Sequence, residues 1–147
     1  MNESRKMIYL CLAHMSEEGL EQKYIQEAFD TNWVVPLGPN VNAFEEDLKQ
    51  FHGNEKEVVA LCSGTAAVHM ALIACGVQAG DEVCVQSFTF CASSHPITYL
   101  GATPVFIDSE KDTWNMDPDL LEQAIEDRIA KTGKKPKAIV PVALYGM

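Results

Sequence analysis

One short polar motif in the chain has a position that suits phosphate binding. Ser63, Gly64 and Thr65 lie between an apolar run, expected to be a strand, and a long apolar segment, expected to be a helix. Gly64 would let the backbone turn tightly and approach a ligand. The start of a helix offers unpaired N–H groups and the positive end of its dipole, and the two hydroxyl groups add donors. In the alternative interpretation Ser63 only caps the helix, and the tripeptide alone favours neither.

A second candidate is the segment SFTF, Ser87–Phe90, at the end of the next expected strand. An aromatic side chain at the carboxyl end of a strand can stack on a flat ring. Ordinary core filling is the alternative, and it is preferred for Phe88. Alternation along a strand places Phe88 and Phe90 on one face, and both cannot stack on the same ring. The chain contains neither a GxxxxGK[ST] nor a GxGxxG loop.

Other polar residues give weaker signals. The histidines have no spacing that would place two of them on one helix face around a metal ion, and no metal is predicted. The carboxylates of Asp108, Glu110 and Asp112 are expected in a solvated turn. The five cysteines are odd in number and lack CxxC spacing, so buried free thiols in a reducing cytoplasm are expected. They are Cys11, Cys62, Cys75, Cys84 and Cys91.

Charge and hydropathy exclude several classes of protein. The 147 residues carry a formal net charge of -10, and an acidic chain repels phosphate backbones, so no nucleic acid partner is expected. The lysines at 134–137 are interrupted by Pro136 and are expected in a solvated loop. No stretch approaches the roughly 20 apolar residues of a membrane span. The amino-terminal residues do not form a signal peptide pattern, and a cytoplasmic location is predicted.

Two helices are expected before the first motif. The first begins near Ser16, and one of its faces is apolar, formed by Leu20, Tyr24, Ile25, Ala28 and Phe29. An irregular loop should cover residues 33–40. The second helix is expected to be capped by Asn42, with Glu45 as its capping-box partner, and to stop at Gly53. It should carry Phe44, Leu48 and Phe51 inward.

Four short apolar runs predict strands, at residues 58–62, 83–86, 104–107 and 138–142. Helices are expected between them, the last capped by Asp117 with Pro118 at its first position. Its buried stripe would be Leu120, Leu121, Ala124, Ile125 and Ile129. This alternation predicts an α/β fold with a parallel sheet and helices on both faces. Such sheets bind ligands at the carboxyl ends of their strands, and the chain ends there, so part of its own site is expected to be missing.

Taken together, these segments resemble the DegT/DnrJ/EryC1/StrS family of nucleotide-sugar aminotransferases. The resemblance runs from about Ile8 onward, with the segments in the family's order and spacing. They are GPNVNAFEEDL, ALCSGTAAVHMALIACGVQAGDEV, SFTF, GATPVFIDSEKDTWNMDPDLLEQAI and KAIVPVALYG. The implied fold is that of the type I pyridoxal phosphate (PLP)-dependent aminotransferases, with a large domain, a small carboxyl-terminal domain and a homodimer. Residues 1–15 would be an amino-terminal segment and residues 16–147 the first part of the large domain.

The resemblance also implies a cofactor, pyridoxal 5′-phosphate, and residues that would bind it. Thr65 and Ala66 would contact the cofactor phosphate, and Ser63 and Gly64 would shape that turn. Phe90 would stack on the pyridine ring, which chooses between the two phenylalanines of SFTF.

On the substrate side, the loop around Gly38 and Pro39 would face the nucleotide sugar. Two residues depart from the family's pattern: Gln86 lies where relatives often have proline, and Ala143 lies where many have histidine. The Schiff-base lysine and the aspartate that pairs with the pyridine nitrogen would follow Met147, so no catalytic residue is assigned within this chain.

The implied activity is transfer of an amino group, with glutamate as the expected donor, to a nucleotide-linked keto-sugar in polysaccharide or glycan precursor synthesis. The chain by itself is expected to be inactive. Two alternatives stay open. One is a sugar dehydratase of the same family, in which histidine replaces the lysine. The other is a non-catalytic, truncated phosphate-binding module, which requires a partner that covers its open sheet edge and its apolar helix.

Overall fold

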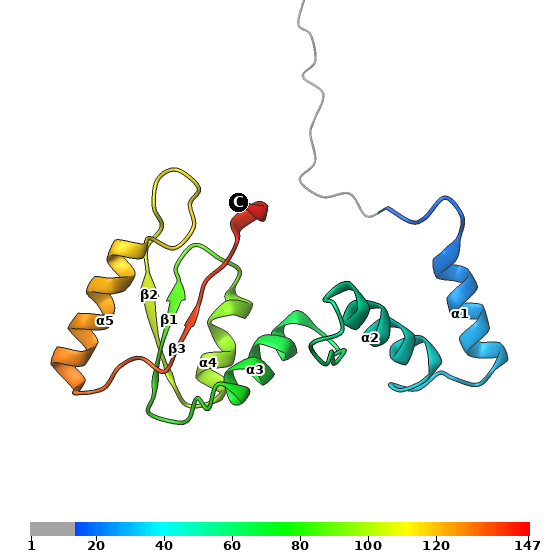
Figure 1. The fold of residues 1–147 in the computed structure, drawn as a ribbon, viewed down its shortest axis with the longest axis horizontal. Coiled ribbons are helices and arrows are strands. Elements are labelled where there is room, and N and C mark those ends of the chain that lie inside the picture. Colours follow the sequence, from blue (N-terminus) through cyan, green and yellow to red (C-terminus); the bar gives the residue numbers. More distant parts are fainter. Residues whose placement is uncertain (1–13) are drawn as a thin grey trace, which may run out of the picture. The chain divides into compact units, whose positions relative to one another are not determined.

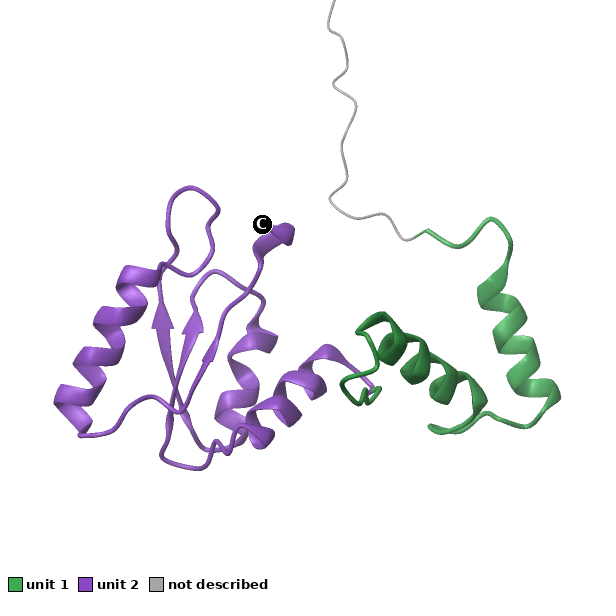
Figure 2. Cartoon of the chain, in the orientation of Figure 1, with its two compact units in different colours: residues 1–60 green, residues 61–147 purple. Residues whose placement is uncertain are grey.

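The computed structural model describes residues 14–147. The chain divides into two compact units, residues 1–60 and residues 61–147, which are described separately (Figure 2). The predictions for Cys11 and for most of the amino-terminal segment lie outside the described residues. The proposed domain boundary at residue 16 stays a prediction.

The first unit contains two helices, α1 (Leu20–Asp30) and α2 (Pro39–Phe51). The segment before α1 is held by Ser16, whose hydroxyl donates to Glu21 Oε2 over 2.6 Å and accepts from Leu20 N over 2.9 Å. The predicted inward face of α2 is wrong: no residue of either helix is buried, and Phe44 is 54% and Phe51 83% exposed. An amphipathic helix buries its apolar stripe only against another layer, and residues 14–60 supply no such layer.

The predicted cap at Asn42 is also wrong. Helix α2 begins at Pro39 with Gly38 as its N-cap, so Asn42 lies inside the helix. Proline fits the first helical position because it has no N–H to leave unpaired. The carboxylate of Glu45 accepts instead from Ala60 N over 2.7 Å. The predicted end is confirmed: His52 caps α2, and Gly53 follows in the left-handed conformation.

The second unit is built on a parallel sheet of three strands in the order β2-β1-β3 (Figure 1). They are β1 (Glu82–Gln86), β2 (Thr103–Ile107) and β3 (Ala138–Val140), with Cys84 level with Val105 and Ile139. Three of the predicted strands are therefore confirmed, although β3 is shorter than expected. The strand predicted at residues 58–62 does not form, and Val59 is 72% exposed. A strand needs a neighbour for its backbone groups, and this segment pairs with none of the three.

Helices lie on both sides of this sheet, as predicted. Helix α5 (Pro118–Thr132) lies on one side, and α3 (Gly64–Ala74) and α4 (His95–Tyr99) lie on the other (Figure 1). The 3₁₀ turns η1 (Cys91–Ser93) and η2 (Leu144–Gly146) follow β1 and β3. Arg128 of α5 forms a bidentate ion pair with Glu82 at the start of β1, with N–O distances of 3.0 and 2.7 Å.

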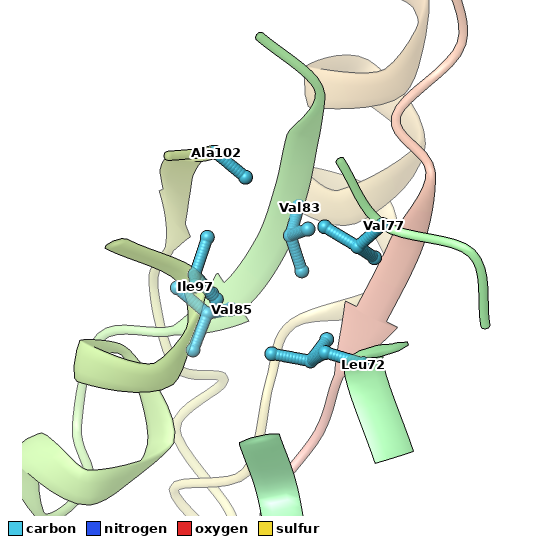
Figure 3. Close-up of a cluster of buried hydrophobic side chains, with 6 residues drawn as sticks. All are labelled: Leu72, Val77, Val83, Val85, Ile97 and Ala102. Carbon is cyan, nitrogen blue, oxygen red and sulfur yellow. The ribbon is translucent and has the colours of Figure 1, made fainter. Parts of the chain in front are cut away.

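The core lies between strand β1 and the helices α3 and α4 (Figure 3). It is formed by Leu72, Val77, Val83, Val85, Ile97 and Ala102. Alternation sends Cys84 and Gln86 to the opposite face of β1, and both are fully buried. The predicted stripe of α5 is only partly buried: Leu121, Ala124 and Ile125 are half-buried, whereas Leu120 and Ile129 are exposed. A sheet of three strands gives a helix of 15 residues only a narrow face.

Asp117 caps α5 as predicted, since its Oδ1 accepts from Asp119 N over 2.8 Å and from Leu120 N over 3.1 Å. We expect Asp117→Ala to lower the free energy of unfolding by about 1 kcal/mol, because two amides of the first turn lose their acceptor. Urea denaturation followed by circular dichroism measures the change. Glu122→Ala, at an exposed position of the same helix, is the matched control and should change little. Equal effects of the two substitutions would contradict the capping role.

No helix formed by residues 14–147 combines the length and the apolar character needed to cross a membrane.

Candidate functional site

The amino-terminal end of α3 is capped by Ser63. Ser63 is extended, and its Oγ accepts from Ala66 N over 3.1 Å while its carbonyl accepts from Ala67 N over 3.0 Å. The capping interpretation of Ser63 is therefore confirmed. The amides of Gly64 and Thr65 have no acceptor among residues 14–147. Two N–H groups thus remain for an anion at the positive end of the helix dipole.

Of the two purposes expected of Gly64, a tight turn and close approach of a ligand, only the second fits the structure. Its φ lies outside the left-handed region, and a Cβ placed there would meet no atom within 4 Å. The turn itself therefore does not require glycine at this position. What the missing side chain provides is open space in front of the free amides, which suits close approach of a ligand to the backbone.

Phe90 lies where β1 leads through a bend into η1, and it is 78% exposed. The turn η1 packs against α3, so the tertiary structure brings the element that begins after Phe90 next to the helix that carries Ser63. The ring of Phe90 is open for stacking among the described residues. Whether it stacks on a cofactor stays a prediction.

Phe88, in contrast, does not fill the core. The interpretation of Phe88 as a core residue is therefore wrong. It is 49% exposed because β1 ends at Gln86, before strand alternation reaches it. Its ring lies 5.7 Å from that of Trp114 with a tilt of 55°. Trp114 holds a left-handed conformation, with φ 65°, in the loop after β2. That conformation is unusual for a bulky side chain and therefore marks a constrained loop.

The pair formed by Phe88 and Trp114 separates two open cavities at the carboxyl ends of the strands, of about 480 and 410 Å³. The larger is lined by Ser87, Phe88, Asp108, Ser109, Glu110, Lys111 and Trp114. The smaller is lined by Phe88, Asp112, Thr113 and Trp114, together with Leu144, Tyr145 and Met147 from the segment after β3. None of the residues predicted to bind the cofactor lines either cavity.

The carboxylates after β2 organise their own loop. Asp108 accepts from Ser87 Oγ over 3.3 Å and from Ser109 N over 2.8 Å. Glu110 accepts from the Thr113 side chain and from the amides of Asp112 and Thr113, and these hydrogen bonds lower the pKa of its carboxyl group. The expectation of a solvated turn agrees with this arrangement. Among residues 14–147, no group of three or more His, Cys, Asp or Glu side chains is placed to share a metal ion.

Gly38 and Pro39 belong to the first unit, where they form the start of α2. Gly38 has φ 145°, and a Cβ there would lie 3.1 Å from Cε3 of Trp33. Glycine is therefore required locally by backbone conformation and by the Trp33 ring. That Gly38 and Pro39 face the nucleotide sugar stays a prediction.

The cysteine expectation needs correction. The four described cysteines are free, as predicted, but only Cys84 is buried, and burial raises the pKa of its thiol. Cys62, Cys75 and Cys91 are exposed. Cys62 is exposed because the predicted strand at residues 58–62, which would have buried it, does not form.

Comparison with known proteins decides the family. Residues 15–147 match the profile of the DegT/DnrJ/EryC1/StrS aminotransferase family. The chain belongs to this family. It is 55% identical over 141 residues to EpsN of Bacillus subtilis (strain 168), by name a pyridoxal phosphate-dependent aminotransferase, covering 96% of this chain and 35% of that protein.

Two further comparisons agree. The chain is 41% identical to a GDP-perosamine synthase of Caulobacter vibrioides, covering 88% of this chain and 33% of that protein. A crystal structure of a DegT DnrJ EryC1 StrS aminotransferase from Brucella abortus matches with a TM-score of 0.73 at 35% identity. That match covers 91% of this chain and 38% of the Brucella chain, and it confirms the predicted fold class. The chain spans about a third of the length of the curated relatives it matches.

In the sequence, Gln86 is only a departure from the family's pattern and has no assigned role. The structure buries it completely and surrounds it with backbone hydrogen bonds. A signal was present in the sequence, since a lone amide in an otherwise apolar strand must find partners if it is buried.

Proposed function

We propose that the protein carrying this chain is a PLP-dependent aminotransferase that moves an amino group from glutamate to a nucleotide-linked keto-sugar. The observation that carries the proposal is the family match over residues 15–147. A relative named GDP-perosamine synthase supports a nucleotide sugar as the substrate, and one named for spore coat polysaccharide biosynthesis supports a role in polysaccharide precursor synthesis.

The residues of this chain fit the cofactor. The α3 start offers two amides without an acceptor among residues 14–147 and open space at Gly64, and Phe90 presents an exposed ring. Ser63, Gly64, Thr65 and Ala66 would hold the phosphate group, with Ser63 keeping the helix start in place. Phe90 would cover one face of the pyridine ring. When bound, pyridoxal 5′-phosphate supplies an electron sink for chemistry at the amine-bearing carbon.

Other parts of the proposal rest on the family alone. Gly38 and Pro39 would face the nucleotide sugar, and the working enzyme would be a cytoplasmic homodimer. The lysine that binds the cofactor and the aspartate that pairs with its ring nitrogen would follow Met147. The isolated chain of 147 residues would accordingly be inactive and would bind PLP weakly.

The test uses the full-length protein incubated with PLP, glutamate and a nucleotide-linked keto-sugar. We expect a visible absorbance change on cofactor binding, an amino sugar detected by mass spectrometry, and 2-oxoglutarate in equal amount. A deoxygenated sugar in place of the amino sugar would identify a dehydratase instead. Residues 1–147 alone are the control, and turnover by them would contradict the proposal that the site is completed by later residues.

A further inference from the structure

Gln86 is the one fully buried polar side chain among residues 14–147. It is the last residue of β1, on the face of the sheet that also buries Cys84, and it immediately precedes the bend that carries Phe88 and Phe90. Burial of an amide without partners is costly, so its surroundings should satisfy it.

All of its hydrogen-bonding capacity is used. Nε2 donates to Phe88 O over 3.1 Å and to Trp114 O over 3.3 Å. Oε1 accepts from Met116 N over 3.0 Å and from Val142 N over 3.2 Å. An amide side chain has two donor hydrogens and two acceptor positions, so this network leaves none unpaired. All four partners are backbone groups.

These bonds join the three segments that leave the carboxyl ends of the strands. One partner lies in the bend after β1, two lie in the loop after β2, and one lies in the segment after β3. A second connection joins the loop after β2 to the segment after β3, because Asn115 Oδ1 accepts from Leu144 N over 2.8 Å. The loop after β2 is thus held to the bend after β1 and to the segment after β3.

The bend that carries Phe90 is held at both ends. Gln86 fixes the Phe88 carbonyl, two residues before Phe90. On the other side, Ser93 N donates to Phe90 O over 3.0 Å, and the Thr89 and Ser93 hydroxyls lie 2.9 Å apart. The ring of Phe90 is 78% exposed among the described residues, so the direction in which it points depends mainly on the backbone of this bend.

We propose that Gln86 is a positioning residue, which holds the Phe90 bend and the segment after β3 in the relative placement that the cofactor ring requires. The inference rests on the proposed function, because Phe90 is taken as the residue that stacks on the ring. Gln86 does not contact the ring itself. It acts through the Phe88 carbonyl on one side and the Val142 amide on the other.

Gln86→Glu in the full-length protein is the test. The substitution preserves shape and the acceptor oxygen but removes both donors and places a charge against the carbonyls of Phe88 and Trp114. At pH 8 we expect the dissociation constant for PLP to rise about tenfold over that of the wild type, since buried acceptors lose their donors. In the protein without cofactor, hydrogen–deuterium exchange of residues 87–94 should become faster.

The difference should shrink at pH 6. Burial and the two carbonyls raise the pKa of the introduced carboxyl group, and its protonated form regains one donor. The charged side chains on the elements around Gln86 include Asp108, bonded to Ser87, and Glu110, bonded within the loop that carries Trp114. The Glu82–Arg128 pair lies at the other end of β1. The ratio of variant to wild-type dissociation constants is therefore compared at each pH, which cancels the cofactor's own titration.

Gln78→Glu is the matched control, because Gln78 is exposed in the loop before β1. It should leave affinity and exchange unchanged. If Gln86→Glu fails to fold at pH 8, the same measurements are made on Gln86→Asn, which keeps the amide but shortens its reach. A folded variant with wild-type exchange over residues 87–94 and wild-type PLP affinity overturns the inference. Absence of PLP binding by the wild type would overturn the proposed function instead, and the exchange result without cofactor would still decide the role of Gln86.

Discussion

Phe90→Ala should weaken PLP binding by the full-length protein by roughly 30-fold, which corresponds to about 2 kcal/mol. The ring is 78% exposed in the structure of this chain, so its removal deprives the core of nothing. The ring would contribute binding energy only when a flat ligand stacks on it. Its removal should therefore weaken ligand binding and leave stability unchanged. Fluorescence titration of the protein with PLP measures the dissociation constant.

Three comparisons make the Phe90 result specific. Phe90→Tyr keeps an aromatic face and should retain affinity within a few-fold. Phe106→Ala removes another exposed phenylalanine, at the edge strand β2, and should leave affinity unchanged. The free energy of unfolding without cofactor should be the same for Phe90→Ala and the wild type. Unchanged affinity in Phe90→Ala would exclude this residue as the stacking partner.

Ile97→Ala should lower the free energy of unfolding by about 2–5 kcal/mol. Ile97 is fully buried in α4 and belongs to the core with Val83 and Val85 of β1 (Figure 3). Its truncation leaves a cavity that the close-packed neighbours fill only in part. The same core holds α3 and α4 against the sheet, so the loss should also loosen the elements that carry the proposed cofactor residues.

Urea denaturation of the chain measures the effect of Ile97→Ala. Ile73→Ala is the matched control, since Ile73 is 45% exposed in α3 and should cost less than about 1 kcal/mol. A loss at Ile97 no larger than that at Ile73 would show that this cluster does not hold the second unit together.

Features that depend on neighbours in the sequence were predictable. The cap at Asp117 formed as expected, and the cap at Ser63 was one of the two interpretations of its motif, because a hydroxyl or carboxylate oxygen reaches amides two or three residues further along the same chain. Gly53 and Gly101 follow helix ends in the left-handed conformation, which glycine adopts without strain. The alternation of short apolar runs with helices was enough to predict a parallel sheet covered on both faces.

Features that depend on distant partners were not predictable in this way. Among residues 14–147, the apolar run at residues 58–62 has strand character but no strand beside it, and helix α1 has no buried residue. Phe88 looked like a core residue because strand alternation was extended to it, although the predicted strand already ended at Gln86, where β1 stops. In each case the local sequence favours a strand or a buried face. Whether that strand or buried face forms depends on a neighbouring element from elsewhere in the chain.

The sequence by itself determined the family, the fold class and the motif at the start of α3, because each rests on residue types in a fixed order along the chain. The tertiary structure alone decided what surrounds that motif. It placed η1 against α3, left the ring of Phe90 open, and buried Gln86 among backbone groups 2, 28, 30 and 56 residues away. The physical reason is that a buried amide must be satisfied, and only folding determines which distant groups satisfy it.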